Sequence, residues 1–107
     1  MAVEINRDNF EAVVQQSDLP IVIDVWGPQC KPCISLMPSV KEMEKEYQDR
    51  MRVGKLNATE NRMLCAKLRV MSLPAFLFFK NGQEVNRIVS DDITIEEVKK
   101  VANEILA

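Results

Sequence analysis

The sequence contains no histidine. This absence excludes hydrolases that rely on a Cys-His pair, and it removes imidazole both as a general base and as a metal ligand. Covalent haem attachment through Cys-x-x-Cys-His is excluded as well, because Ile34 follows Cys33. Any side chain that accepts a proton in a reaction of this protein is therefore a carboxylate, an amine or a thiol.

Charge of one sign is not concentrated anywhere in the chain. The 14 Lys and Arg residues and the 16 Asp and Glu residues give a formal net charge of −2. No run of basic residues forms the positive footprint that nucleic acid or anionic lipid requires. We therefore expect neither a nucleic-acid partner nor a membrane partner.

Long hydrophobic runs are missing too. No stretch approaches the roughly 20 apolar residues of a membrane-spanning helix, and residues 1–4 have neither the basic nor the apolar region of a secretory signal. A chain of 107 residues has the size of one ordinary domain. We expect a cytoplasmic monomer with a single domain over residues 1–107.

Cysteine is also scarce. The chain has three cysteines, Cys30, Cys33 and Cys65, which are too few for the disulfide scaffold of a small secreted protein. Structural zinc normally takes four ligands, and one Cys-x-x-Cys pair with a distant Cys65 does not supply them. Redox chemistry is therefore the favoured interpretation, with half a zinc site and an inert structural disulfide as the alternatives. We expect no metal and no cofactor.

Cys30 and Cys33 stand where the apolar segment 21–26 gives way to an amphipathic helix. On the first turn of a helix, this spacing places the two Cβ atoms on one side, at a separation that a disulfide can span. Unpaired N–H groups and the positive end of the helix dipole stabilise a thiolate there and lower the pKa of a cysteine. The pattern predicts a reversible dithiol/disulfide pair.

Hydrophobic periodicity and turn signals predict alternating strands and helices. Strands are expected at residues 3–5, 21–26, 51–57, 75–80 and 83–89, and helices at residues 6–16, 30–48, 61–68 and from residue 94 onward. The continuously apolar segment 21–26 is typical of the centre of a parallel sheet. Asn81-Gly82 suits a two-residue type I′ turn, which makes the last two strands antiparallel.

With these elements in order, the chain resembles thioredoxin over nearly its whole length. The resemblance rests on Asp24 in Ile-Val-Ile-Asp-Val-Trp, Trp26, the Cys30-Lys31-Pro32-Cys33 pair opening a helix that contains Pro38, Lys55 in Gly-Lys-Leu-Asn, Leu73-Pro74, and Phe78-Phe79-Lys80-Asn81-Gly82. It implies an α/β thioredoxin fold, with a central mixed sheet of about five strands flanked by four helices. It also implies a dithiol oxidoreductase that reduces disulfides in client proteins and is itself reduced by a thioredoxin reductase drawing on NADPH or ferredoxin.

The position of each cysteine suggests its role. Cys30 is nearer the helix end, where free amides reach its sulfur and an incoming disulfide can approach in line, so it is the expected nucleophile. Cys33, one turn in, is expected to resolve the mixed disulfide. Burial of Asp24 would raise its pKa and let it exchange a proton with Cys33, and Lys55 on the neighbouring strand of the thioredoxin arrangement could pair with it. Asp24 at an exposed strand end would instead be only a polar terminator.

Two further positions are expected near the dithiol. Most X-Pro bonds in folded proteins are trans, but the resemblance implies a cis Leu73–Pro74 bond packed against the cysteines. Such a bond would leave the Leu73 backbone open to pair with an extended client segment. Trp26 is expected beside the disulfide, and as the only tryptophan it could equally belong to the core.

The chain departs from the usual thioredoxin sequence Trp-Cys-Gly-Pro-Cys at two positions. Gln29 replaces the aromatic residue, and this changes the surface that meets partner proteins. Lys31 replaces glycine, and its charge favours the Cys30 thiolate and makes the couple slightly more oxidising, unless the side chain points into solvent. Pro32 stiffens the loop. Client contacts are expected from Trp26, Gln29, Lys31, Pro32, Leu73 and Pro74.

Two other functions remain open. An oxidant, isomerase or glutaredoxin-like role belongs to the same class, although glutaredoxins usually lack the N-terminal strand and helix and carry Thr-Val-Pro where Ser72-Leu73-Pro74 stands. A thioredoxin-fold binding or assembly module with incidental thiols belongs to another class, and Gln29 keeps it open. Cys65 is expected to be a small buried hydrophobe, with a regulatory thiol as the alternative.

Overall fold

The computed structural model describes residues 2–107. Five strands form a mixed sheet in the order β1-β3-β2-β4-β5. Their bounds are β1 Val3–Glu4, β2 Ile21–Trp26, β3 Arg52–Asn57, β4 Ala75–Lys80 and β5 Gln83–Val89. β3 runs parallel to β1 and β2, β4 runs antiparallel to β2, and β5 runs antiparallel to β4. The expected α/β fold is confirmed, with the apolar segment 21–26 as the central strand.

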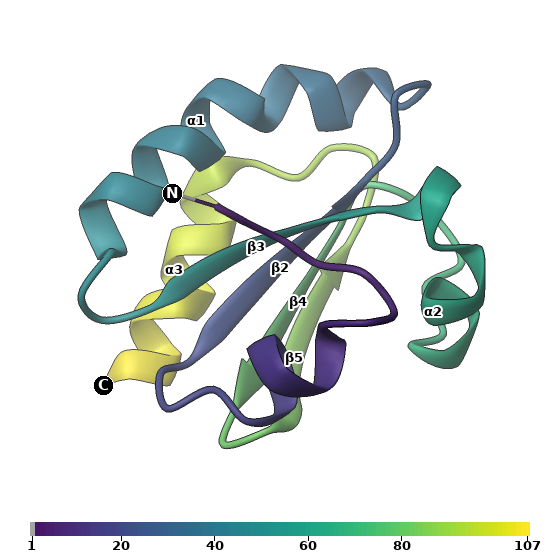
Figure 1. Ribbon diagram of the computed structural model, residues 1–107. Helices are drawn as coiled ribbons and strands as arrows, with labels where there is room; N and C mark the ends of the chain where they lie inside the picture. Colours follow the sequence, from purple (N-terminus) through teal and green to yellow (C-terminus); the bar gives the residue numbers. More distant parts are fainter. Residues whose placement is uncertain (1) are drawn as a thin grey trace.

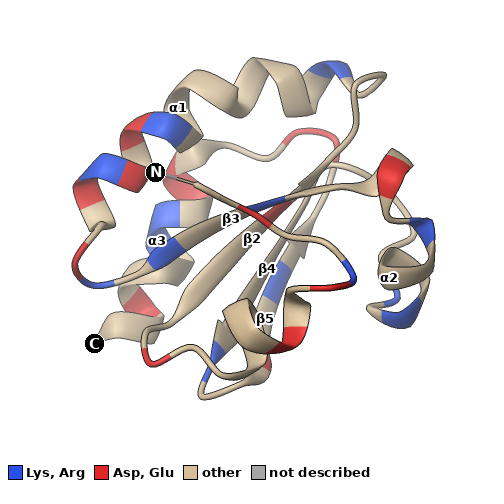
Figure 2. Ribbon diagram, viewed as in Figure 1, with Lys and Arg blue, Asp and Glu red and all other residues tan. Residues whose placement is uncertain are grey.

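Helices cover both faces of this sheet (Figure 1). α1 (Lys31–Tyr47) and α3 (Ile95–Leu106) lie on one face, whereas η1 (Glu11–Gln15) and α2 (Arg62–Lys67) lie on the other, with the 3-10 turn η2 (Ala58–Glu60) leading into α2. Acidic and basic residues both occur on α1 and on α3 (Figure 2).

Alternation of side chains along β2 divides the interior into two cores. Ile21, Ile23 and Val25 belong to the cluster under η1 and α2, while Val22 belongs to the cluster under α1 and α3. The same alternation turns Asp24 toward the α1 face, so a carboxylate enters an otherwise apolar layer.

The first helix is shorter than expected. The sequence predicts a helix over residues 6–16, but regular helical structure begins only at Phe10 and continues through η1, which ends with a bond from the Gln16 N–H to the Glu11 carbonyl. Upstream, the Asn6 side chain accepts bonds from the Asp8 and Asn9 N–H groups, and the Asn9 side chain accepts from the Asn6 N–H. The Asp8 and Asn9 N–H groups have no partner within a helix that starts after Asn6, so these bonds form an N-cap at Asn6, as the residue type predicts. The Phe10 N–H then donates to the Asn6 carbonyl at 3.1 Å, and this capped turn leads into η1.

The hairpin between β4 and β5 follows the prediction. Asn81 has φ 54° and Gly82 has φ 79°, which is the pair of positive values that a type I′ turn requires. At Gly82 this conformation also serves packing, because a Cβ there would lie 2.5 Å from the Gln15 carbonyl oxygen. The turn therefore lets the hairpin approach the end of η1 closely.

Candidate active site

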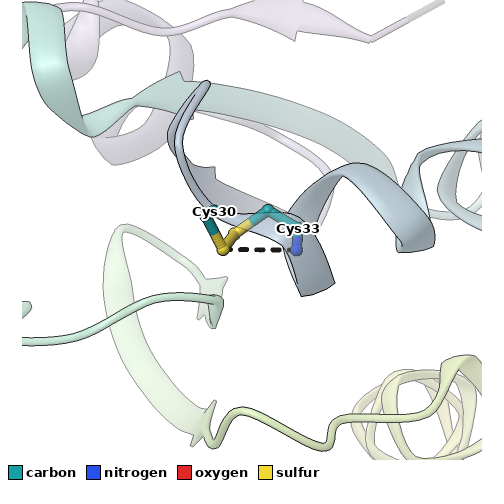
Figure 3. Close-up of a disulfide and its surroundings, with 2 residues drawn as sticks. All are labelled: Cys30 and Cys33. Carbon is teal, nitrogen blue, oxygen red and sulfur yellow. Dashed lines mark hydrogen bonds between the residues drawn. A yellow bond between two sulfur atoms is a disulfide. The ribbon is translucent and has the colours of Figure 1, made fainter.

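Cys30 and Cys33 form a disulfide at the start of α1. Their sulfur atoms are 2.09 Å apart and their Cα atoms 5.2 Å apart. Cys30 occupies the N-cap position, with extended backbone, and its sulfur accepts a hydrogen bond of 3.2 Å from the Cys33 N–H (Figure 3). The helix therefore directs one of its free amides at the Cys30 sulfur, which is where a thiolate would gain stabilisation when the disulfide opens.

The two sulfurs differ in access. Cys33 is only 1% exposed, because the first turn of α1 lays it against the sheet. Cys30 is partly exposed at the helix end. An external disulfide can therefore reach Cys30 and cannot reach Cys33 without a change in structure.

The residues around Cys30 present polar and charged groups to solvent. Gln29 and Lys31 are exposed, and Pro32 is half-buried at the beginning of α1. Pro32 costs no hydrogen bond at this position, because an N–H in the first helical turn has no partner within the helix. Gln29 and Lys31 thus flank the accessible sulfur on the surface of the molecule.

Asp24 is buried in the layer between the sheet and α1. It is 2% exposed, and its Oδ2 has no hydrogen-bond partner among the described residues. Burial raises the pKa of Asp24 to about 7, and the positive charge of Lys55 opposes part of that rise. The alternative of an exposed polar terminator is wrong, and the carboxyl group can take up or release a proton near neutral pH.

The charge of Lys55 acts on both Asp24 and Trp26. Lys55 is the register partner of Asp24 on β3, so both side chains point to the α1 face of the sheet. The Lys55 Nζ lies 5.5 Å from the centre of the Trp26 ring, within the range of a cation–π interaction. Trp26 is half-buried, and its Nε1 is a second buried atom without a hydrogen-bond partner in residues 2–107.

The segment before β4 lies against the loop that carries the cysteines. The Leu73–Pro74 bond is cis, as the resemblance implies. A Cβ on Gly27 would come within 3.2 Å of Leu73 Cδ1, so the absence of a side chain at Gly27 lets the two segments approach. Leu73 and Pro74 are thereby placed at the same end of the sheet as the start of α1.

Two exposed apolar side chains at this end were not predicted. Met71 is 89% exposed just before Leu73, and Ile34 is 44% exposed directly after Cys33. The sequence offered no signal for this exposure, because apolar character by itself favours burial. Ile34 thus adds exposed apolar area directly after Cys33, and Met71 adds it on the segment that leads to Leu73.

Within residues 2–107, no group of three or more cysteine or carboxylate side chains is arranged to hold a metal ion. No helix in the same range combines the length and apolar character that crossing a membrane requires. Cys65 is a buried free cysteine, and burial raises its pKa.

Comparison with known proteins agrees with the site. The family model described as Thioredoxin matches residues 1–104. A thioredoxin of Acetoanaerobium sticklandii is 36% identical over 96 residues, covering 90% of this chain and 91% of that protein. A thioredoxin of Haemophilus influenzae is 40% identical over 81 residues, covering 76% of each chain. A chloroplastic M-type thioredoxin of Spinacia oleracea is 34% identical over 86 residues, covering 80% of this chain and 48% of that protein. The chain belongs to the thioredoxin family and is, like its members, a thiol–disulfide oxidoreductase.

Proposed function

We propose that Cys30 is the attacking thiol in the reduction of disulfides in client proteins. The Cys30 thiolate attacks one sulfur of the client disulfide, which forms a mixed disulfide and releases the other client sulfur as a thiolate. Cys33 then attacks the Cys30 sulfur and releases the second client thiolate. Two electrons pass to the client, and Cys30–Cys33 is left oxidised. The observation that carries this assignment is the difference in access between a partly exposed Cys30 and a Cys33 that is 1% exposed.

Asp24 is the proposed proton acceptor for Cys33. A carboxyl group with a pKa of about 7 exists in both protonation states near neutral pH, so it can accept the Cys33 proton in the resolving step and return it in the reverse direction. The charge of Lys55 stabilises the ionised carboxylate, which keeps this pKa from rising further. Lys55 therefore tunes the base without touching the client.

The client is proposed to bind across the exposed end of the sheet. Trp26 and Pro32, which are half-buried, supply contact beside the disulfide, and the exposed Gln29 and Lys31 flank the attacking sulfur. Pro74 is buried, and through its cis bond to Leu73 it presents the Leu73 backbone, which pairs with an extended client segment. Because an exposed Gln29 replaces a large aromatic residue, we expect a client set that differs from that of thioredoxins with Trp-Cys-Gly-Pro-Cys.

The fold family implies disulfide-containing clients and a reductase. We propose that the reductase is an NADPH- or ferredoxin-linked thioredoxin reductase, that the protein acts as a monomer with one domain over residues 1–107, and that it works in the cytoplasm. A couple that gives electrons to clients must be re-reduced continually, which a reducing compartment supports.

A redox titration tests the proposal. The purified protein is equilibrated with dithiothreitol buffers of known potential, and thiols are trapped with an alkylator that adds mass and is mapped by peptide. We expect one reversible two-electron transition confined to Cys30 and Cys33, with Cys65 unlabelled in the folded protein because it is buried and its pKa is raised. A midpoint near that of protein-disulfide isomerases would indicate an oxidising role instead, and failure to form the couple at any potential would leave only a binding module.

Trapping experiments assign the two thiols. Cys33→Ser is expected to accumulate a mixed disulfide between Cys30 and a client, whereas Cys30→Ser is expected to accumulate none, because Cys33 is inaccessible. Cys65→Ala is the matched control and should turn over like the original protein. Equal trapping by both serine variants would contradict the assignment of the nucleophile.

A further inference from the structure

One residue of β5 disturbs the pairing with β4. Leu77 pairs with Arg87 and Phe78 with Asn86, but Phe79 pairs with Glu84, so the register shifts between Phe78 and Phe79. The shift makes Val85 an extra residue on β5, which is the arrangement of a β-bulge. In a regular strand, residues three positions apart point to opposite faces, and the bulge cancels that difference for Glu84 and Arg87.

Glu84 and Arg87 consequently meet on one face of the sheet. Their partners Leu77 and Phe79 both belong to the core under η1 and α2. The Arg87 Nε donates to Glu84 Oε2 at 2.5 Å, and the Arg87 Nη2 donates to Glu84 Oε1 at 2.7 Å. This two-point geometry fixes the plane of the guanidinium group.

Two further N–H groups of Arg87 donate to backbone carbonyls at the end of α2. Nη2 donates to the Leu68 carbonyl at 2.8 Å and Nη1 donates to the Arg69 carbonyl at 3.1 Å. Carbonyl groups at the C-terminus of a helix have no partner within the helix. The guanidinium therefore supplies hydrogen bonds that the helix end needs, and it connects α2 to β5, which follows α2 in the chain by way of β4.

The backbone directly after α2 forms a hydrogen-bonded turn of its own. The Arg69 N–H donates to the Ala66 carbonyl at 3.1 Å and the Val70 N–H donates to the Cys65 carbonyl at 2.9 Å, which together make a Schellman motif. Arg69 holds φ 58°, a conformation that glycine adopts more readily. External hydrogen bonds to its carbonyl favour this turn over alternatives.

The segment that follows this anchored turn is the one proposed above to pair with the client. Residues 70–74 lead from Arg69 to the first residue of β4, Ala75, and they include the exposed Met71 and the Leu73 side chain that approaches Gly27. The segment is therefore held at one end by β4 and at the other end by the contacts of Arg87.

We propose that Glu84 and Arg87, here called the Glu84–Arg87 clamp, are positioning residues for client recognition. The clamp holds residues 70–73 where a client backbone can pair with Leu73 beside Cys30, and so it sets client affinity without touching the sulfur atoms. This inference rests on the proposed reduction of protein disulfides.

Loss of the clamp is expected to weaken client binding selectively. Arg87→Ala leaves two helix-end carbonyls without their donors and frees the segment to sample other positions. If the binding-competent position is occupied about one tenth of the time, the apparent KM for a protein client rises about tenfold, because apparent affinity scales with the competent fraction. The maximal rate and the midpoint potential stay unchanged, since the reacting sulfurs keep their surroundings.

Two substrates separate recognition from chemistry. 5,5′-Dithiobis(2-nitrobenzoic acid) serves as a small disulfide that needs no backbone pairing; because dithiothreitol reduces it directly, it is mixed with pre-reduced protein freed of dithiothreitol, and the rate of the single turnover is measured. Insulin serves as the protein client, with dithiothreitol as the electron donor. KM and kcat are measured for the original protein, Arg87→Ala, Arg87→Lys and Glu84→Gln. Lys99→Ala is the matched control, because it breaks the 3.0 Å Lys99–Glu46 ion pair between α3 and α1, away from the client segment.

The expected result is a higher KM for insulin in Arg87→Ala, with unchanged kcat, small-disulfide rate and potential. Arg87→Lys should restore little, since a single ammonium group cannot reproduce the two-point geometry, and Glu84→Gln should give an intermediate KM. An insulin KM for Arg87→Ala within about twofold of the control, or an equal loss of rate on both substrates, overturns the inference. If the original protein reduces neither substrate, the proposed function fails instead.

Discussion

Replacing Asp24 by Asn should change how stability depends on pH. The folded protein keeps Asp24 in an apolar layer, where burial raises its pKa from 3.8 to about 7. In the unfolded chain the same carboxyl group is solvated and ionises near its ordinary pKa. The two states therefore hold different numbers of protons between about pH 4 and pH 7.

The sign follows from which state holds the proton. Below about pH 4 both states are protonated, so Asp24 contributes no pH dependence. Between about pH 4 and pH 7 the folded protein keeps the proton that the unfolded chain releases, and the free energy of unfolding falls as pH rises. Above about pH 7 both states are ionised and the loss stays constant. The rise of the pKa from 3.8 to about 7 is about three powers of ten in the protonation equilibrium, and at about 1.4 kcal/mol for each power the total loss is about 4 kcal/mol.

Urea unfolding of the oxidised protein from pH 4 to pH 9 measures this loss. The amide side chain of Asp24→Asn cannot titrate. The free energy of unfolding of the variant minus that of the original protein should therefore increase by about 4 kcal/mol from pH 4 to pH 8. The Asn amide adds an offset that does not vary with pH, which makes the change in the difference the decisive quantity. Asp18→Asn, at an exposed position, is the control and should leave the difference flat. A change below about 1 kcal/mol for Asp24→Asn would refute the reasoning.

Two further variants test packing and charge. Gly82→Ala should lower the free energy of unfolding by more than about 1 kcal/mol, because a Cβ at φ 79° would lie 2.5 Å from the Gln15 carbonyl oxygen. Asn81→Gly, at the neighbouring turn position with φ 54°, is the control and should lower it by less than about 0.5 kcal/mol in the same urea assay. Lys31→Ala should lower the midpoint potential of the dithiol couple by less than about 30 mV, since Lys31 is exposed. Lys41→Ala, at another exposed position, is the control and should not change the potential. A rise in potential for Lys31→Ala would contradict the proposed stabilisation of the Cys30 thiolate.

Much of the fold was predictable because its signals are local. The apolar run of β2, the cysteine at the N-cap of α1 and the Asn81-Gly82 turn each encode their structure within a few residues. The cap at Asn6 was predictable as well, but residues 7–9 after it form only a turn before the helical residues 10–15, and a cap residue alone does not fix where the regular helix begins.

The site was predictable only in part, since some of its features depend on distant segments. Burial of Asp24 came from the resemblance, because a carboxylate in an apolar strand is equally compatible with an exposed strand end. The Glu84–Arg87 clamp could not be foreseen, because without the extra residue Val85 the alternation of β5 would place the two side chains on opposite faces. A single unpaired residue thus decides whether the ion pair exists.

Burial also separates the residues that are proposed to perform chemistry from those that are proposed to meet a client. Cys33 and Asp24 are 1% and 2% exposed, so a client can alter neither without entering the core. Gln29 and Lys31, where the chain departs from Trp-Cys-Gly-Pro-Cys, are exposed, as is Met71. Because both departures lie on the exposed side, they act first on which disulfides reach Cys30 and only weakly on the electron transfer that follows. We therefore expect this protein to differ from other thioredoxins in the clients that it selects rather than in the reaction that it performs.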